Sequence, residues 1–346
     1  MVRRVVIPRN GDVDVLELRE GPPDPLVPGS LRLRVAAAGV NFADLLMRMG
    51  LYPEAPRRPF VPGYEVAGVV TEVSEEAARG RPDLVVGTRV AAGTRFGGYA
   101  EEVVVPASKV LALPPDWSFE EGAGFPVCFI TAWVALCAMA RIRAGDRVLV
   151  QGIAGGVGLA ALGIARAEGA RVAGSCGGPA KVEAALRHGA ERAIDYRNED
   201  IAASVRAWAP QGVDVVLEPR GGRAMRESLS LLRPTGRLVL FGVSEMASGR
   251  RRNLLAGARA ALPLLHLNPL RLVNGNLGLY GLNVLTLWDR DDLMGPALTA
   301  LEAGARRGIY RPVLDRSFPL ERAGEAHRYI HERRNIGKVV LTTGAV

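Results

Sequence analysis

The sequence predicts an α/β protein that combines a doubly wound parallel sheet with a second, β-rich domain. Three observations support this fold class. A strand, a glycine turn, a helix and a second strand follow one another between residues 147 and 175. Short apolar strands then alternate with helices as far as residue 241, whereas residues 1–122 contain short strand patterns separated by Gly and Pro. Strand–helix alternation is typical of a parallel sheet, and closely spaced short strands are typical of an antiparallel β-domain.

The glycine turn at 152–158 is the strongest candidate for a binding site. It lies between a buried strand and an Ala- and Leu-rich helix. Gly155 and Gly156 would let the main chain approach a pyrophosphate, which the free N–H groups at the start of a helix favour. Ile153 stands where the usual G-x-G-x-x-G pattern has its first glycine, so the βαβ context carries the assignment. We expect a dinucleotide site, with a plain βαβ crossover as the alternative. Its residues are Ala154, Gly155, Gly156, Val157 and Gly158.

The end of the second strand indicates which dinucleotide binds. NAD sites usually have Asp or Glu there, about 20 residues past the glycines, to bond the ribose 2′-hydroxyl. This chain has Gly174-Ser175-Cys176-Gly177-Gly178, without a carboxylate to repel a 2′-phosphate. Lys181, Tyr196 and Arg197 could hold that phosphate by charge-assisted hydrogen bonds, with Ser175 at the same edge. NADPH is therefore the expected cofactor; a solvated Lys181 in the first turn of the next helix is the alternative.

The segments that follow continue the alternation. We expect helices at 179–188, 201–209 and 223–232, and strands at 193–196, 213–217 and 237–241. Residues 244–275 depart from this rhythm, because three arginines at 250–252 precede an apolar run punctuated by Pro263 and Pro269. That insertion could wall a substrate cleft, pack on the surface or contact a membrane surface. Residues 277–285 predict the last strand of the sheet, and strands at 309–315 and 337–342 flank a helix at 320–333.

The β-rich region leads into a helix. Its strand patterns occupy residues 31–38, 65–73, 89–92 and 99–106. Ser118 and Glu121 then have the spacing of a capping box, and Phe125-Pro126 interrupts the helical pattern before a helix from Thr131 to Ala140.

Composition and charge are those of a soluble globular protein. The 346 residues are 48% hydrophobic and 23% charged, enough for two domains with full cores. The charge of +8 comes mostly from Arg scattered through ordinary helix and strand patterns, so we do not expect nucleic-acid binding. The 3 cysteines lie too far apart for a disulfide framework or a zinc lobe, and a reducing cytoplasm is the simplest compartment. We find neither a signal peptide nor an apolar run of the about 18 residues that a membrane span needs.

Many short motifs occur in a fixed order from about Leu31 to the end. They are Gly39-Val40-Asn41-Phe42-Ala43-Asp44, Gly50-Leu51-Tyr52-Pro53, Pro62-Gly63-Tyr64-Glu65-Val66-Ala67-Gly68-Val69, Gly97-Gly98-Tyr99-Ala100-Glu101, Thr131-Ala132, the glycine turn, Gly221-Gly222 and Asn335-Ile336-Gly337-Lys338. This order resembles the medium-chain dehydrogenase/reductase superfamily, in its zinc-free quinone oxidoreductase (zeta-crystallin-like) branch. Asn41-Phe42-Ala43-Asp44-Leu45 and the insertion at Arg252-Asn253-Leu254 are most similar to the subgroup named for the vesicle amine transport protein.

The resemblance implies an architecture and further cofactor contacts. It implies a GroES-like catalytic domain formed by residues 1–122 and 289–346, a Rossmann domain at 123–288, and NADPH in the cleft. It adds Thr131, Phe241, Gly242 and Asn335 to the expected cofactor contacts. It also implies a homodimer joined through the strand at 277–285, which agrees with the aggregation hazard of an open apolar edge strand.

The departures from zinc-dependent relatives bear on the chemistry. Those relatives have Cys where this chain has Asn41, His where it has Tyr64, and a four-cysteine lobe that is missing here. A tetrahedral catalytic zinc would lack its ligands, so we expect no metal and no alcohol dehydrogenation. What remains is direct hydride transfer to a small, apolar, electron-poor quinone or α,β-unsaturated carbonyl.

The resemblance places Asn41 and Tyr52 as hydrogen-bond donors at the substrate oxygen. Helix capping for Asn41 and core packing for Tyr52 are the alternatives. Leu46 stands where several relatives have a second Tyr, which makes the expected pocket more apolar.

Other candidates carry less chemistry. His327 and His331 have the i, i+4 spacing of zinc ligands, but their charged segment predicts a solvated helix face. Asp44 and Glu65 are interpreted as structural carboxylates without a paired partner. Two alternative functions stay open: a 2-enoyl thioester reductase, and a non-catalytic NADPH-binding protein acting in membrane or RNA association.

Overall fold

The structure, a computed structural model, describes residues 1–244 and 269–346. Within them the chain forms two compact units. The first comprises Met1–Cys128 and Met294–Val346, and the second comprises residues 129–244 and 269–293. The predictions for residues 245–268, which include the three arginines and the apolar run, concern residues outside these described ranges.

The first unit is built on a seven-stranded sheet and a two-stranded antiparallel sheet. The larger sheet has the order β14-β15-β3-β4-β5-β7, with β6 also paired to β3, and the smaller pairs β1 with β2. The strands are β1 (Val2–Val6), β2 (Glu17–Gly21), β3 (Ser30–Val40), β4 (Glu65–Val73), β5 (Arg89–Gly93), β6 (Glu102–Pro106), β7 (Val110–Ala112), β14 (Leu314–Pro319) and β15 (Lys338–Thr342). Alternate Leu and Val residues of β3 face a core that includes Leu31, Leu33 and Val35.

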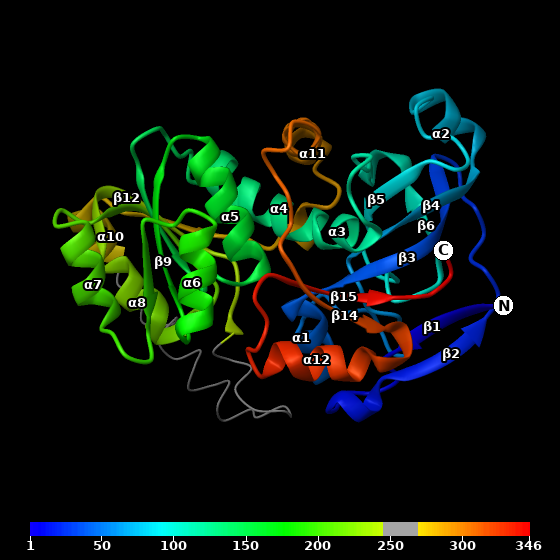
Figure 1. Ribbon diagram of the computed structural model, residues 1–346, viewed down its shortest axis with the longest axis horizontal. Coiled ribbons are helices and arrows are strands. Elements are labelled where there is room, and N and C mark those ends of the chain that lie inside the picture. Colours follow the sequence, from blue (N-terminus) through cyan, green and yellow to red (C-terminus); the bar gives the residue numbers. More distant parts are fainter. Residues whose placement is uncertain (245–268) are drawn as a thin grey trace. The chain divides into compact units, whose positions relative to one another are not determined.

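Residues from the two ends of the chain lie side by side in this sheet. β15 runs antiparallel to β3, pairing Val339 with Val40, and β14 runs parallel to β15. Figure 1 shows these two red strands beside the blue β3. The C-terminal segment therefore completes a sheet that the N-terminal segment begins.

Short helices punctuate the first unit. They are η1 (Val13–Val15), α1 (Phe42–Met49), α2 (Glu75–Gly80), η2 (Ala107–Lys109), α3 (Phe119–Gly124), η6 (Leu320–Arg322) and α12 (Ala323–His331). The predicted capping box is confirmed: the Ser118 hydroxyl accepts the N–H of Glu121, and the Glu121 carboxylate accepts that of Ser118. The predicted interruption at Phe125-Pro126 is confirmed, because α3 ends at Gly124. The next helix, α4, begins at Pro126, earlier than the predicted start at Thr131.

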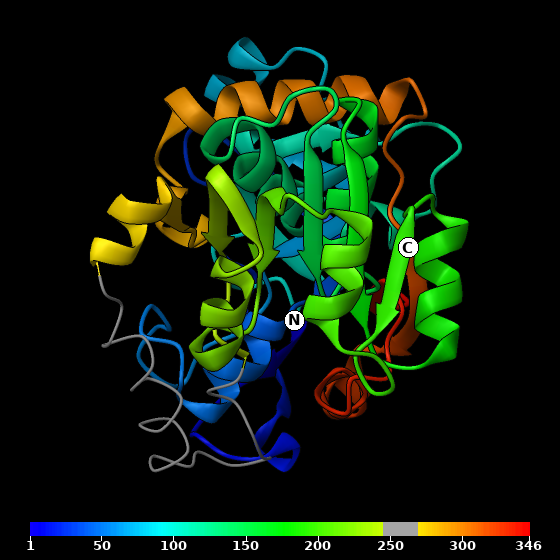
Figure 2. The same cartoon turned by 90° about the vertical axis from the view of Figure 1, so that its left-hand side faces the viewer.

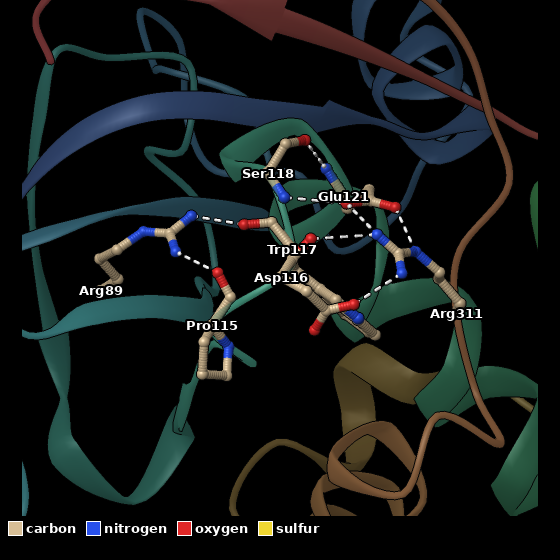
Figure 3. Close-up of polar contacts among 7 residues, drawn as sticks. All are labelled: Arg89, Pro115, Asp116, Trp117, Ser118, Glu121 and Arg311. Atoms are coloured by element: carbon tan, nitrogen blue, oxygen red, sulfur yellow. Dashed lines mark hydrogen bonds and ion pairs between the residues drawn. The ribbon is translucent and has the colours of Figure 1, made fainter.

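Two arginines hold the segment that precedes α3 (Figure 3). Arg311 pairs with Asp116 at 2.8 Å and with Glu121 at 2.5 Å. From the other side, Arg89 donates to the carbonyl oxygens of Pro115 and Trp117. The start of α3 is thereby tied both to β5 and to the segment that leads to β14.

Contrary to the expectation from the sequence, one helical stretch of the described residues, Phe119–Met139, is long and apolar enough to cross a membrane by length and composition. It comprises α3, α4 (Pro126–Trp133) and the π-helical turn η3 (Val134–Met139). Its most apolar window is 72% buried inside the protein, which is also what a core helix shows.

The second unit is a doubly wound sheet with six strands in the order β10-β9-β8-β11-β12-β13. Its strands are β8 (Arg147–Gln151), β9 (Arg171–Cys176), β10 (Arg192–Asp195), β11 (Val213–Glu218), β12 (Leu232–Leu240) and β13 (Gly278–Gly281). Between them run α5 (Gly156–Ala167), α6 (Pro179–Arg187), α7 (Ile201–Trp208), α8 (Gly222–Leu229) and α10 (Pro269–Gly275), and then η5 (Val284–Leu287) and α11 (Asp291–Arg306) follow. Figure 2 shows these elements in green, yellow and orange. Every neighbouring pair of strands is parallel, so the predicted fold class is confirmed.

Several boundaries differ from the predicted ones. The last strand of the parallel sheet spans only Gly278–Gly281, because a 3-10 turn begins at Val284. The strand predicted at 309–315 begins instead at Leu314, and its polar residues Asp315, Arg316 and Ser317 hide it from a hydrophobic pattern. α11 was not predicted, because Gly295 and Pro296 interrupt its helical signal.

Candidate functional site

The predicted dinucleotide turn lies at the carboxyl end of β8 and opens α5. Gly155 is the N-cap of this helix, and among the described residues no side chain caps it. The first N–H groups of a helix lack intrahelical partners, and residues 155–157 are partly exposed here. The turn therefore offers backbone donors and a helix dipole to an anion, as a pyrophosphate requires.

A further glycine, Gly152, completes the motif. It has a left-handed φ of 70°, and its carbonyl oxygen accepts the N–H of Gly155 at 3.0 Å. The glycines thus recur as Gly152, Gly155 and Gly158, a G-x-x-G-x-x-G spacing that could have been found in the sequence. At Gly158 a Cβ would lie 2.4 Å from the Gly152 oxygen, so only glycine fits the close approach of helix and strand.

The residues expected at the 2′-phosphate gather at the ends of β9 and β10. A Cβ on Gly177 would lie 2.6 Å from the Tyr196 hydroxyl, and one on Gly178 would lie 3.3 Å from Nη1 of Arg197. Lys181 lies in the first turn of α6. Burial raises the pKa of the Cys176 thiol to about 11, and the nearby charge of Lys181 acts in the opposite direction. Three polar side chains and a glycine pair therefore share one edge of the sheet.

Asp195 adds to this edge a carboxylate that was not among the predicted site residues. Its Oδ1 accepts the N–H groups of Gly178 and Arg197 at 2.9 and 3.1 Å, and its Oδ2 accepts Nδ2 of Asn198. The Gly178 and Arg197 N–H groups, the largest causes, lower the pKa of Asp195. Its charge is thus bound by local donors, which hold the Gly177-Gly178 turn against Tyr196 and Arg197.

Ser175 belongs to a buried polar chain across the carboxyl ends of three strands. Its hydroxyl donates to Oε1 of Gln151, and Nε2 of Gln151 donates to the Ser228 hydroxyl at 3.2 Å. Ser228 then donates to Glu218 at 2.7 Å, and Glu218 also holds Arg220. This chain of hydrogen bonds was not predicted, although the sequence places a polar residue at or next to the end of each of these buried strands.

The remaining predicted cofactor contacts are distributed over both units. Phe241 and Gly242 follow β12 in the second unit, where the Phe241 N–H donates to the Glu218 carbonyl at 3.1 Å. Thr131 is buried on α4, also in the second unit. Asn335 belongs to the first unit, and its Nδ2 donates to the Gly337 carbonyl just before β15.

Asn41 lies in a polar cluster at the ends of three adjacent strands of the first unit. Nζ of Lys338 donates to Oδ1 of Asn41 at 2.6 Å, and Nδ2 of Asn41 donates to Oε1 of Glu65 at 2.9 Å. Nζ of Lys338 and Oε1 of Glu65 are 2.5 Å apart, with side chains 4% and 0% exposed. Asn41 does precede α1, but its side chain bonds this ion pair, and Asp44 accepts its backbone N–H at 2.8 Å.

Glu65 therefore has the partner that the sequence did not reveal. Burial opposes the charge of Lys338, but Cys128 and Glu65 outweigh burial and raise the pKa of Lys338. A permanent ammonium beside Asn41 would repel a divalent cation. Among residues 1–244 and 269–346, no group of three or more His, Cys, Asp and Glu could hold a metal ion. The residues present at the zinc position of metal-dependent relatives thus do not fit a metal.

Tyr52 follows α1, at the opposite end of that helix from Asn41. Its ring packs against that of Tyr64, with centroids 6.3 Å apart, and the Tyr64 hydroxyl donates to Sδ of Met47 at 3.8 Å. Burial, with Tyr52 as the next cause, raises the pKa of Tyr64, so Tyr64 stays a neutral phenol. Because Tyr64 and Glu65 are consecutive, this dipeptide contacts both predicted substrate donors.

The expectation of a solvated face around His327 is wrong. His327 is 0% exposed, and its Nε2 lies 3.1 Å from the Tyr99 hydroxyl, which also bonds Asp44 at 3.1 Å. Burial lowers the pKa of His327 to about 3 and raises the pKa of Asp44 to about 7. This buried network ties α12 to α1 and is structural in its position.

Comparison with known proteins identifies the family. Residues 27–115 match the model of the alcohol dehydrogenase GroES-like domain, and residues 188–341 match that of a zinc-binding dehydrogenase. The mouse synaptic vesicle membrane protein VAT-1 homolog is 36% identical over 99% of this chain and 84% of its own length.

Solved structures agree with this assignment. The quinone oxidoreductase of Thermus thermophilus, determined also with NADPH, is 37% identical with a TM-score of 0.80, over 99% of this chain and 100% of that one. The CurK enoyl reductase is 26% identical with a TM-score of 0.83, over 99% of each chain. The fold and the cofactor turn define a medium-chain oxidoreductase. The chain belongs to the zinc-free medium-chain dehydrogenase/reductase family, in its quinone oxidoreductase and VAT-1-like group.

Proposed function

We propose that this protein reduces quinones or α,β-unsaturated carbonyls with NADPH and without zinc. The observation that carries the proposal is Asn41, which replaces a metal ligand and is hydrogen-bonded to the buried ammonium of Lys338. Without a metal to polarise an alkoxide, the substrate must already be electron-poor.

The cofactor prediction is confirmed by the family and by relatives solved with NADPH. NADPH, when bound, supplies a hydride. In our proposal the backbone at Gly155 and Gly156 holds the pyrophosphate, and Lys181, Tyr196 and Arg197 hold the 2′-phosphate. The exposed side chains of Tyr196 and Arg197, which lie beside Gly177 and Gly178, support this placement.

The first unit would supply donors to the substrate oxygen as negative charge develops there. Nδ2 of Asn41 carries a second N–H besides the one given to Glu65. The hydroxyl of Tyr52, whose ring packs against that of Tyr64, is the other proposed donor. Preorganised donors of this kind stabilise the transition state more than the ground state.

The test is oxidation of NADPH, followed by absorbance, with a panel of benzoquinones, naphthoquinones and enals. We expect turnover that Asn41→Leu lowers by about 10²–10³-fold, as removal of an oxyanion donor does. Unchanged NADPH binding in this variant would show that the loss is not one of folding. No turnover with any acceptor in the panel would refute the proposal.

A 2-enoyl thioester reductase is the second candidate, favoured by the similarity to the CurK enoyl reductase. Crotonyl-CoA added to the same assay separates the two enzymes. A non-catalytic NADPH-binding protein would bind the cofactor and reduce none of these substrates. We further propose a homodimer joined at β13 and a cytoplasmic location, the latter because Cys128, Cys137 and Cys176 are free thiols.

A further inference from the structure

The cluster of Lys338, Glu65 and Asn41 has a property that a single hydrogen bond would not give. We propose that Lys338 and Glu65 are positioning residues, which fix the Asn41 amide in one orientation and so present its second N–H to the substrate oxygen. This inference rests on the proposed function, since it assigns how one of its donors is aimed.

The chemistry of the two partners decides the orientation. An ammonium only donates hydrogen bonds, and an ionised carboxylate only accepts them. The amide oxygen must therefore face Lys338, at 2.6 Å, and the amide nitrogen must face Glu65, at 2.9 Å. A flipped amide would place N–H groups against an ammonium and an oxygen against a carboxylate. Both contacts would become repulsive in a buried setting, where such repulsion is strongest.

The partners are themselves fixed. The second carboxylate oxygen of Glu65 accepts the N–H of Val127 at 2.8 Å, and the first lies 2.5 Å from Nζ of Lys338. Gly39 makes room for this carboxylate, because a Cβ there would lie 2.5 Å from Oε1 of Glu65. Glu65 and Lys338 begin β4 and β15, and Asn41 follows β3, which pairs with both strands. The backbone of one sheet thus sets the three side chains.

The direction of the remaining N–H follows from these contacts. One N–H of the planar amide group points at Glu65, so the second is fixed in the same plane, away from that carboxylate. Asn41 is partly exposed, whereas Lys338 and Glu65 are buried. Only the asparagine can therefore touch substrate, and its two neighbours act through it.

The test is a kinetic cycle that separates positioning from general stability. Lys338→Met combined with Glu65→Gln removes both buried charges together, so that neither is left unpaired. When Asn41 is present, we expect this pair of changes to lower kcat by about 10–100-fold, which is part of the loss caused by removing the donor itself. KM and the affinity for NADPH should change little. In an Asn41→Leu background the same changes should alter kcat less than about 2-fold, because the group they position is absent.

Two controls bound the result. Lys338→Arg keeps the cation, so this variant should retain most of the kcat of the unmodified protein. Lys109→Met removes the other buried lysine of the first unit, and we expect it to leave kcat unchanged. Equal losses of kcat with and without Asn41, or an unchanged kcat in the Lys338/Glu65 variant, would overturn the positioning role.

A second readout does not need turnover. The two side-chain amide protons of Asn41, assigned by their loss in Asn41→Leu, should give widely separated NMR signals with slow solvent exchange. In the Lys338/Glu65 variant, the separation and the exchange rate of the two signals should approach those of a solvated asparagine. If that variant does not fold, signals in the unmodified protein with the separation and fast exchange of a solvated asparagine would refute the inference by themselves. Failure of all acceptors in the unmodified protein would instead refute the proposed function, and these signals would still decide the orientation.

Discussion

His327 and Asp44 meet through one hydroxyl, that of Tyr99, and their ionisations affect stability in opposite directions. Burial, followed by the charge of Arg48, lowers the pKa of His327 from 6.5 to about 3. As pH falls below 6.5 the unfolded chain binds a proton that the folded chain refuses, so this contribution destabilises the fold toward acid. Burial raises the pKa of Asp44 from 3.8 to about 7. Its contribution is fully present below pH 3.8 and is lost as pH rises through 7.

Replacing His327 by a residue that does not titrate should therefore leave the contribution of Asp44 to the pH dependence of stability. His327→Gln keeps an N–H donor for Tyr99 but cannot titrate. Between pH 6 and 4 we expect its free energy of unfolding, relative to the unmodified protein, to improve by up to about 1.4 kcal/mol per pH unit toward acid. Urea unfolding at several pH values measures this slope. Parallel curves for the two proteins would show that His327 does not stay neutral in the fold.

Cofactor choice is also decided by single residues. If Lys181 bonds the 2′-phosphate, the unmodified protein should bind NADPH much more tightly than NADH. Lys181→Ala should reduce the difference in binding free energy between NADPH and NADH by about 1.5–3 kcal/mol, the value of a hydrogen bond to a charged group. Arg187→Ala, in the same helix but paired with Glu183, should leave this difference unchanged. Calorimetric titration with both cofactors measures it, and equal affinities before any mutation would contradict the assignment.

At the scale of elements, α5 packs closely on the turn that precedes it, so its glycines differ in how well they would tolerate a side chain. A Cβ on Gly158 would lie 2.4 and 2.6 Å from two backbone oxygens, whereas a Cβ on Gly163 would have nothing within 4 Å. We expect Gly158→Ala to destabilise the protein by about 1–3 kcal/mol and to abolish NADPH binding. Gly163→Ala should stabilise it by about 0.5–1 kcal/mol, because alanine favours a helix interior. Thermal unfolding and NADPH titration compare the two; similar behaviour of both variants would show that the turn tolerates a side chain.

The edge strand β13 carries the dimer proposal. Leu279 packs partly against the core of its own unit, so its replacement by Lys would damage the monomer as well as an interface. Gly281 is the better position. Leu282 donates its N–H to Leu240, so the alternation of a strand turns the N–H of Gly281 to the open side.

Gly281→Pro should remove that outward donor and split a dimer that pairs β13 with its two-fold mate. Gly281→Ala is the matched control, since its Cβ would have nothing within 4 Å. Sedimentation velocity distinguishes the species. A monomer before mutation, or a dimer that survives the proline, would contradict the proposed joint.

At the scale of the whole molecule, the residues at positions 41 and 64 lead to a simple expectation. With Asn41 and Tyr64 at the ligand positions of zinc-dependent relatives, exhaustive chelation should change neither the unfolding temperature nor turnover. Atomic absorption on the purified protein checks the same point. Stoichiometric zinc would mean that the site has been misread.

The sequence predicted those parts of the fold that have a local signal. β8, α5 and β9 were found because apolar runs, a glycine turn and a helix succeed one another within one βαβ unit. Contacts between distant residues have no such signal. Asn41 and Lys338 are 297 residues apart, and Tyr99 and His327 are 228 apart, so neither network could be inferred from spacing. For the same reason His327 was assigned to solvent by its charged neighbours, although the fold buries it.

Because the C-terminal end of the chain forms part of the first sheet, this sheet can be completed only late in translation. A ribosome completes β3 and β4 long before it reaches β15, which pairs with β3 and carries Lys338. Until then residues 37–40 of β3 lack their partner strand, although β6 already pairs with residues 30–34, and the carboxylate of Glu65 lacks its cation. The second unit lies between these segments, so it can form while the first is still open. The last strand to be translated therefore closes the sheet and neutralises the interior charge in one event, and nascent chains stalled before residue 338 should be the ones that chaperones retain.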